Sequence, residues 1–272
     1  MSLKRQNDIL QVVRAKGSYS IAELAARLGV STETIRRNIQ PLIEDGTLLR
    51  FHGGIMLPDA VEEPPFQRRM HVNNDAKSTI AALVREQIAD GDSLILDNGT
   101  TSAYVANALS NHSGLTVVTH SVQIAHRLAS KNGNRVFMAG GELTGEDGVA
   151  VGLTSLDFLR QFQVRYAFIS VAGITLDGDL GDFHLFEAEF ARVAMQQAQE
   201  VWVIADRTKF GRDAPVKVCQ LSAIDTLVSD GPPPAGFSAR CRAAGVRILT
   251  PDGPLNAAAP RGGAAPLAER IT

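Results

Sequence analysis

From Asp75 onward, short apolar segments alternate with segments of helical periodicity, and this alternation restricts the chain to few folds. Apolar strands separated by helices indicate an α/β domain with a mainly parallel sheet, because parallel strands need a crossover connection. The predicted strands are residues 94–96, 115–118, 135–138, 166–171, 201–205, 226–228 and 246–249, and the predicted helices are residues 76–89, 102–109, 122–129, 155–162, 187–197 and 237–244.

Small and polar residues follow these strands, at the edge where such sheets bind ligands. Gly99 permits close backbone approach, and the hydroxyls of Thr100 and Thr101 can hold an anion together with helix amides. Asp97 can accept a sugar hydroxyl, and Lys209 is a cation suited to phosphate. Taken alone, the residues of each loop are more typical of turns and caps than of ligand contacts, whereas five such loops at one edge favour a binding site. The predicted effector-binding residues are Asp97, Gly99, Thr100, Thr101, Thr119, Ser121, Gly140, Gly173, Glu187, Asp206 and Lys209.

Residues 1–57 are predicted to form a winged helix-turn-helix domain. Ser20 and Glu23 have the spacing of a capping box at the start of a second helix, which Gly29 ends. Ser31 caps a third helix that has apolar residues on one face and polar residues on the other. The alternatives are a plain three-helix bundle and a winged helix used for protein contacts.

The outward face of the third helix and the following hairpin carry side chains suited to DNA. Arginine can contact guanine edges through two hydrogen bonds, and hydroxyls at a helix start can hold phosphates. Residues 47–57 are predicted to form the hairpin, or wing, with Arg50 and His52 beside the DNA backbone. The predicted DNA-binding residues are Ser31, Thr32, Thr34, Arg36, Arg37, Gln40, Arg50 and His52.

Charge and composition favour the same division of the chain. Residues 1–57 have a net charge of +3 and the remainder has −5, as expected for a small DNA reader attached to an acidic sensor. Residues 58–75 contain prolines without apolar periodicity and are predicted to be a linker, followed by an effector-binding domain over residues 76–252. Residues 253–272, rich in Ala, Pro and Gly, are predicted to be disordered.

Other features bear on the compartment and on cofactors. The chain has two cysteines, no apolar N-terminal segment and no membrane-length apolar run, which predicts a cytoplasmic protein without membrane contact. It has neither a Walker loop nor a G-x-G-x-x-G motif, so nucleotide binding is not indicated and no cofactor is expected.

The sequence resembles the DeoR family of transcriptional regulators in both halves. In the N-terminal half the resemblance lies in Val30 to Arg37 followed by Leu49 to Gly54. In the C-terminal half it lies in four motifs, namely D-x-G-T-T from Asp97, T-x-S from Thr119, the pair Gly140-Gly141, and D-x-[ST]-K-F-G from Asp206. The resemblance implies a fold like that of ribose-5-phosphate isomerase and a phosphorylated sugar or polyol as inducer.

Within the family, four stretches are most similar to members that respond to glycerol 3-phosphate: residues 109–112, 140–148, 154–163 and 230–234. Glycerol 3-phosphate is therefore the first effector to consider. The chain departs from the family pattern at Asn38, where relatives have Asp beside the two arginines, and at Ala191, where relatives commonly have Lys. The resemblance thus implies a change in arginine orientation or operator preference, and leaves the identity of the inducer open.

Two alternatives compete with the interpretation of the α/β domain as a sensor without catalytic activity. Asp97, Glu187, Glu189, Asp206 and Lys209 could supply acid–base groups to a sugar-phosphate isomerase fused to a DNA-binding domain. Asp182, His184 and Glu187 could bind a metal ion, although a solvated acidic loop explains them better and no metal is expected.

We also expect a homo-oligomer, a dimer or tetramer, because one helix-turn-helix reads too few base pairs of double-stranded operator DNA.

Overall fold

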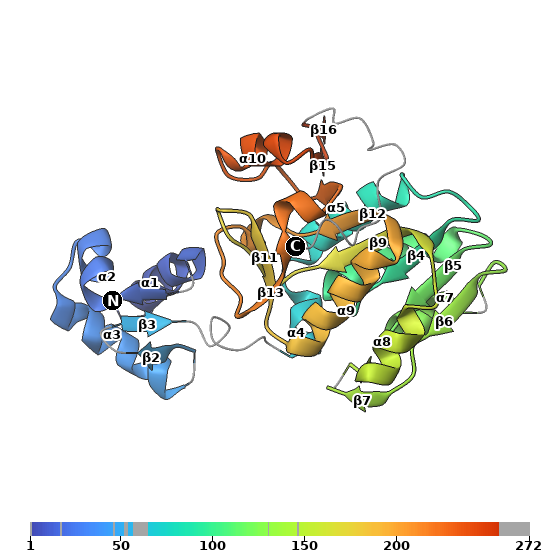
Figure 1. Ribbon diagram of the computed structural model, residues 1–272. Helices are drawn as coiled ribbons and strands as arrows, with labels where there is room; N and C mark the ends of the chain where they lie inside the picture. Colours follow the sequence, from blue (N-terminus) through green and yellow to red (C-terminus); the bar gives the residue numbers. More distant parts are fainter. Residues whose placement is uncertain are drawn as a thin grey trace. The chain divides into compact units, whose positions relative to one another are not determined.

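The computed structural model describes residues 2–16, 18–45, 47–51, 54–56, 65–129, 131–145 and 147–255. The chain divides into two compact units, Met1–Pro64 and Pro65–Thr272. Figure 1 shows the helices and strands of each unit. Among the residues described, no helix combines the length and the apolar character needed to cross a membrane.

The first unit combines helices with a small antiparallel sheet of strand order β1-β3-β2. Its core includes the fully buried side chains of Ile9, Leu24, Ile35, Ile39 and Ile55. Because β1 pairs with β3, the predicted hairpin becomes part of a three-stranded wing. The elements are α1 (Ser2–Lys16), β1 (Ser18–Ser20), α2 (Ile21–Leu28), α3 (Thr32–Glu44), β2 (Leu49–Phe51) and β3 (Gly54–Met56).

Local signals set the ends of these helices, as predicted. The Glu23 amide donates to the Ser20 hydroxyl at 3.1 Å, and the Ser20 amide donates to the Glu23 carboxylate at 2.8 Å, which completes the capping box. Gly29 ends α2 with a φ of 63°, a conformation that glycine adopts without strain. The Ser31 hydroxyl accepts from the Thr34 amide at the start of α3.

The second unit is built on an eight-stranded sheet of order β16-β15-β14-β12-β9-β4-β5-β6. Only β16 is antiparallel to its neighbour, so the prediction of a mainly parallel sheet is confirmed. The strands are β4 (Ser93–Leu96), β5 (Thr116–Thr119), β6 (Arg135–Met138), β9 (Val164–Ser170), β12 (Ala198–Ile204), β14 (Thr226–Val228), β15 (Arg247–Thr250) and β16 (Gly253–Pro254).

Helices cover both faces of this sheet. Leu94 and Leu96 of β4 belong to one buried cluster, with residues of α5, α6 and α7, whereas Ile95 between them belongs to a second, with residues of α8, α9 and α10. This pattern is typical of a parallel sheet buried on both sides. The helices are α4 (Phe66–His71), α5 (Asn74–Arg85), α6 (Thr100–Ala108), α7 (Val122–Leu128), α8 (Leu153–Leu159), α9 (Leu185–Gln196) and α10 (Phe237–Ala243).

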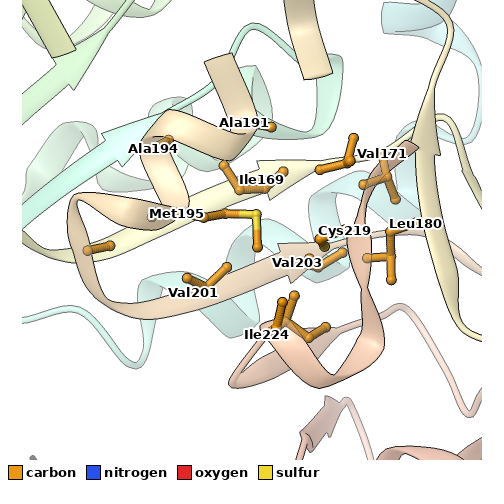
Figure 2. Packing of buried hydrophobic residues seen from close by; sticks show 14 of the residues in the cluster. Ile169, Val171, Leu180, Ala191, Ala194, Met195, Val201, Val203, Cys219 and Ile224 are labelled. Atoms are coloured by element: carbon orange, nitrogen blue, oxygen red, sulfur yellow. The ribbon is translucent and has the colours of Figure 1, made fainter. Parts of the chain in front are cut away.

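The core beneath α9 joins the helix to the centre of the sheet. Figure 2 shows Ala194 and Met195 of α9 near Ile169 of β9 and near Val201 and Val203 of β12. All of these side chains are buried. Because α9 rests directly on β9 and β12, the residues at its start lie near the carboxyl edge of the sheet.

The order of the strands reverses beside β4. From β4 the chain continues outward through β5 to β6, and β9 then returns to pair with the other side of β4. The carboxyl ends of β4 and β9 therefore lie at a topological switch point, where open α/β sheets form a crevice.

Several features differ from the predictions. The expected linker 58–75 contains α4, whose Phe66 is buried, and the start of α5; apolar packing folds these residues onto the second unit. A short hairpin and a three-stranded antiparallel sheet were not foreseen: β7 (Glu142–Thr144) with β8 (Val149–Val151), and β10 (Gly173–Ile174) with β11 (Asp179–Asp182) and β13 (Val216–Gln220). Of the predicted disordered tail, residues 256–272 lie outside the described part of the chain.

Candidate DNA-binding surface and effector site

The outward face of α3 presents the predicted DNA-binding side chains to solvent. Thr32, Arg36, Arg37 and Gln40 are exposed. The Arg36 guanidinium lies 3.5 Å from the carboxylate of Glu33 one turn earlier, and both side chains are more than half exposed. An exposed pair of this kind is weak and can be replaced by a phosphate.

The other predicted contacts lie at the two ends of this face. The Ser31 and Thr34 hydroxyls are 2.9 Å apart, so the helix cap links them to each other. Arg50 of β2 donates to the Gln40 side-chain oxygen at 3.5 Å, which connects the wing to α3. The predicted contact at His52 lies outside the described residues.

Asn38 occupies a different place from the one expected. Its side chain is 7% exposed, and its amide donates to the Thr34 carbonyl at 2.8 Å. It thus lies on the inner face of α3, away from the outward arginines. An ionised aspartate has no proton to donate to that carbonyl. The departure from the family pattern therefore lies on the inner face of α3, and its effect on the arginines and on operator preference stays a prediction.

Asp97 forms the centre of the switch point in the second unit. One carboxylate oxygen accepts from the Ser170 amide at 2.6 Å and from the Ser170 hydroxyl at 2.9 Å. The other accepts from the Gly99 amide at 3.1 Å and from the Ser102 hydroxyl. Burial raises the pKa of Asp97, and these four hydrogen bonds oppose that rise. Because a carboxylate has about four acceptor positions, Asp97 is occupied within the protein. The predicted contact with a sugar hydroxyl therefore lacks a free acceptor.

Gly99 allows β4 to approach β9 closely. A Cβ atom at this position would lie 1.8 Å from the Ser170 hydroxyl oxygen. Gly99 is also the residue before α6, so no side chain caps the first amides of that helix. Thr100 and Thr101 follow, and both are about nine-tenths buried or more. The start of α6 thus combines amides, two hydroxyls and the positive end of the helix dipole.

Lys77 adds a cation that sequence reasoning missed. It lies on the buried face of α5 with Ile80, Ala81 and Val84, and only 4% of its surface is exposed. Its Nζ lies 6.0 Å from the ring centre of Tyr104, one turn into α6, and donates to the Arg69 carbonyl. The spacing 77, 80, 81, 84 was the available signal, because a lysine within an apolar stripe requires a polar partner.

Two further predicted residues lie near Lys77. Burial and the nearby charge of Lys209 lower the pKa of Lys77 to about 8, while Asp206 opposes the shift. The Asp206 carboxylate accepts from the Thr208 amide at 2.9 Å and from the Asn73 side chain at 3.4 Å. The two lysines and Asp206 therefore form one charged group beside the carboxyl end of β12.

Three of the remaining predicted residues have internal roles. The Thr119 hydroxyl accepts from the Ser121 amide at 3.1 Å, and the Ser121 hydroxyl accepts from the Ile124 amide at 3.4 Å to cap α7. Gly173 belongs to β10, where a Cβ atom would lie 2.5 Å from the Arg212 carbonyl oxygen. Gly140 is exposed, with no atom near its Cβ position. These contacts explain Thr119, Ser121 and Gly173 as turn, cap and strand residues, and no contact explains Gly140.

The family departure at Ala191 has a structural explanation. Ala191 is 4% exposed and packs in the cluster beneath α9, so the position carries no charge and no polar atom (Figure 2). The neighbouring Arg192 donates to the Lys217 carbonyl at 2.5 Å and is not a replacement at the sheet edge. Lys77 and Lys209 instead supply the positive charge near the site.

A buried histidine and a carboxylate lie beside this edge. The Nε2 atom of His120 is 3.8 Å from the Glu187 carboxylate, and its ring stacks on Phe190 with centres 3.5 Å apart. Burial lowers the pKa of His120 to about 3, so the ring is neutral at ordinary pH. In the described part of the chain, the His, Cys, Asp and Glu side chains form no group of three that could hold a metal ion.

A helix-turn-helix unit and an α/β unit with a crevice at its topological switch point are the two parts expected of a DNA-binding regulator that senses a ligand. The comparisons with known proteins give the family. Residues 5–61 match the DeoR-like helix-turn-helix domain, and residues 72–231 match the DeoR C terminal sensor domain. The chain belongs to the DeoR family, which confirms the predicted DNA-binding transcriptional repressor.

Curated relatives are similar over most of their length. The glycerol-3-phosphate regulon repressor of Escherichia coli (strain K12) is 38% identical over 231 residues, which cover 85% of this chain and 92% of the relative. The HTH-type transcriptional repressor CsqR of the same organism is 32% identical over 247 residues, which cover 91% of this chain and 95% of that relative.

Solved structures with a similar fold share little sequence with this chain. Ribose 5-phosphate isomerase A from Methanocaldococcus jannaschii is 17% identical, with a TM-score of 0.38, over 51% of this chain and 55% of that chain. The eIF2B beta subunit from Chaetomium thermophilum is 15% identical, with a TM-score of 0.43, over 57% of this chain and 48% of that chain.

Proposed function

We propose that the second unit senses a phosphorylated polyol or sugar, and that this ligand releases the repressor from its operator. The observation that carries the proposal is Lys77, a buried cation beside the first turns of α6. A buried lysine is costly unless an anion accompanies it. A phosphate group between Lys77, the α6 amides and the hydroxyls of Thr100 and Thr101 would satisfy all of these groups.

Glycerol 3-phosphate is the first effector to test. This choice rests on the relative from Escherichia coli that is named as a glycerol-3-phosphate regulon repressor. Lys209 and Asp206 lie close enough to Lys77 to alter its pKa, so they would contact the same ligand. Glu187, at the start of α9, would contribute a carboxylate for a hydroxyl group.

We propose sensing rather than isomerisation. Asp97, the most central carboxylate at the switch point, accepts four internal hydrogen bonds and has no free position for proton transfer. Incubation with aldose and ketose phosphates should therefore give no interconversion. Measurable turnover by the purified chain would contradict this part of the proposal.

Release from DNA requires that the ligand bind the DNA-incompetent state more tightly, since equal affinity for both states shifts nothing. A tenfold loss of operator affinity needs about 1.4 kcal/mol of coupling free energy between ligand binding and DNA binding.

We further propose an even-numbered homo-oligomer that binds paired half-sites. A monomeric mass at micromolar concentration, together with full operator affinity, would overturn the oligomer proposal.

Calorimetric titration with glycerol 3-phosphate, and with pentose and hexose phosphates, tests the site. Lys77→Met, Lys209→Ala and Thr100→Ala should each weaken binding at least about tenfold, since charge-assisted hydrogen bonds are worth about 1.5–3 kcal/mol. Lys217→Met is the matched control, because Lys217 is exposed and pairs with Asp179 on β11. Binding that all three site variants leave unchanged would show that the site lies elsewhere.

A further inference from the structure

Three buried polar atoms just beyond the carboxyl ends of parallel strands have no hydrogen-bond partner among the residues described. One is the Ser229 hydroxyl oxygen after β14, and the other two, the side-chain oxygen of Asn98 and the Nε2 atom of His120, follow neighbouring strands. Asn98 is 2% exposed and His120 is 1% exposed. They follow β4 and β5, which are paired neighbours with Leu96 opposite Thr119. Buried polar atoms are rarely left unpaired, so such atoms at a sheet edge call for an explanation.

The Asn98 and His120 atoms are both acceptors. The Asn98 side-chain amide donates to Asp147 in the β7–β8 loop, which leaves its carbonyl oxygen. Burial lowers the pKa of His120, so its ring is neutral. A hydrogen bond between the ring and the Ala150 backbone opposes this shift, because it favours a proton on the ring. The nitrogen that faces Ala150 therefore carries the proton, and Nε2 keeps a lone pair.

A third acceptor lies beside His120. The Glu187 carboxylate is 3.8 Å from His120 Nε2, and the neutral ring cannot donate to it from that atom. Stacking on Phe190, one turn along α9, holds the ring in this position. The imidazole nitrogen and the carboxylate thus lie side by side, and the amide oxygen follows the neighbouring strand at the same edge. A group bound by these acceptors must donate protons.

An ionised phosphate has no proton to donate, whereas each hydroxyl of a polyol has one. We propose that Asn98, His120 and Glu187 form the hydroxyl-reading part of the effector site, and that they select ligands with a free hydroxyl over the corresponding deoxy compounds. This inference rests on the proposed function. The phosphate-binding part starts next to Asn98 in sequence, at Gly99, so both parts belong to one edge.

The expected selectivity is large. A site built around buried acceptors rejects an analogue that lacks the hydroxyl, because the side-chain oxygen of Asn98 and the Nε2 atom of His120 are then left without a partner. His120→Phe removes the acceptor and retains an aromatic ring to stack on Phe190. Glu187→Gln keeps the shape of the side chain and replaces one acceptor with a donor. Glu187 is partly exposed, so this second variant disturbs the core less.

The experiment compares matched pairs of ligands on the full chain, in EDTA so that no divalent cation occupies the acceptors. The pairs are glycerol 3-phosphate with n-propyl phosphate, ribose 5-phosphate with 2-deoxyribose 5-phosphate, and glucose 6-phosphate with 2-deoxyglucose 6-phosphate. The protein should bind the hydroxylated member of at least one pair about tenfold or more tighter. Both variants should reduce that ratio by about tenfold and leave the affinity for the deoxy member within about twofold.

His126→Phe is the control, because it makes the same substitution at an exposed position of α7. Unchanged ratios in both variants, with phosphate binding retained, would overturn hydroxyl reading and leave the phosphate sensor intact. The absence of binding by every phosphate would overturn the proposed function and this inference together.

Discussion

The carboxylate of Asp97 accepts both the amide and the hydroxyl of Ser170, at 2.6 and 2.9 Å, and so joins the carboxyl ends of β4 and β9. The two residues are 73 positions apart in sequence. Their strands are the neighbours at which the strand order reverses. The same carboxylate holds Gly99 and Ser102 at the start of α6. Asp97 therefore fixes the shape of the candidate effector site from inside.

The close approach of Gly99 to Ser170 leads to the first prediction. Gly99→Ala should destabilise the second unit by at least about 2 kcal/mol, because the new Cβ would overlap the Ser170 hydroxyl and overpacking of this kind costs about 1–3 kcal/mol or more. Gly140→Ala is the control, since no atom lies within 4 Å of its Cβ position. Thermal unfolding measures both. Equal melting temperatures for the two variants would contradict the close approach of Gly99 to Ser170.

The hydrogen bonds of Asp97 predict a second effect. Asp97→Asn places an NH2 group against N–H or O–H donors, because both carboxylate oxygens accept from such groups. We expect a loss of about 2 kcal/mol in the free energy of unfolding of the second unit. Asp157→Asn, at an exposed Asp–Arg pair, should cost less than about 1 kcal/mol. Urea unfolding of both variants distinguishes a central from a peripheral role for Asp97.

Much of the fold could be predicted because its signals are local. The alternation of apolar strands with helices indicated the parallel sheet, and Ser20, Glu23 and Gly29 marked the ends of α2 through contacts a few residues apart. The short strands β7, β10 and β11 could not be predicted, because their pairing depends on tertiary neighbours. The strand β11 has the sequence Asp-Leu-Gly-Asp, which has little intrinsic tendency to form a strand.

The candidate site was predicted only in part, because some of its contacts join residues that are distant in sequence. The edge of the sheet and the loop from Asp97 to Thr101 followed from the rule for α/β sheets. The internal role of Asp97 could not be foreseen, because its partner Ser170 is distant in sequence. The sequence placed Lys77 in a helix but assigned it no function. Its burial depends on how α5 packs against α6, which the sequence does not show.

The buried cysteines lead to a third prediction. Burial raises the pKa of both Cys219 and Cys241 to about 12, so neither thiol forms the reactive thiolate at neutral pH. Ellman's reagent should therefore leave the native chain unlabelled and should modify both thiols in guanidinium chloride. Rapid labelling of the native chain at pH 8 would contradict this prediction.

The lowered pKa of Lys77 predicts how ligand binding depends on pH. Its amine is charged below a pKa of about 8 and becomes neutral above it; burial favours the loss of the proton most, Lys209 and Arg69 add to this effect, and Asp206 opposes it. A phosphate group attracts only the charged form. Affinity for glycerol 3-phosphate should thus fall as pH rises from 7.5 to 9.5, by up to about tenfold per pH unit. Lys77→Met should bind more weakly and lose this dependence, and the same slope in both proteins would contradict the assignment.

The exposed face of α3 gives the last prediction. Arg37→Ala and Arg36→Ala should each cost about 1–3 kcal/mol in operator affinity if the arginine reads a base edge. A contact with phosphate alone would instead weaken binding to all sequences equally and reduce the salt dependence. Arg85→Ala, at the exposed end of α5 in the second unit, is the control. Gel-shift titrations at two salt concentrations separate these cases, and full operator affinity in both α3 variants would show that DNA binds elsewhere on the first unit.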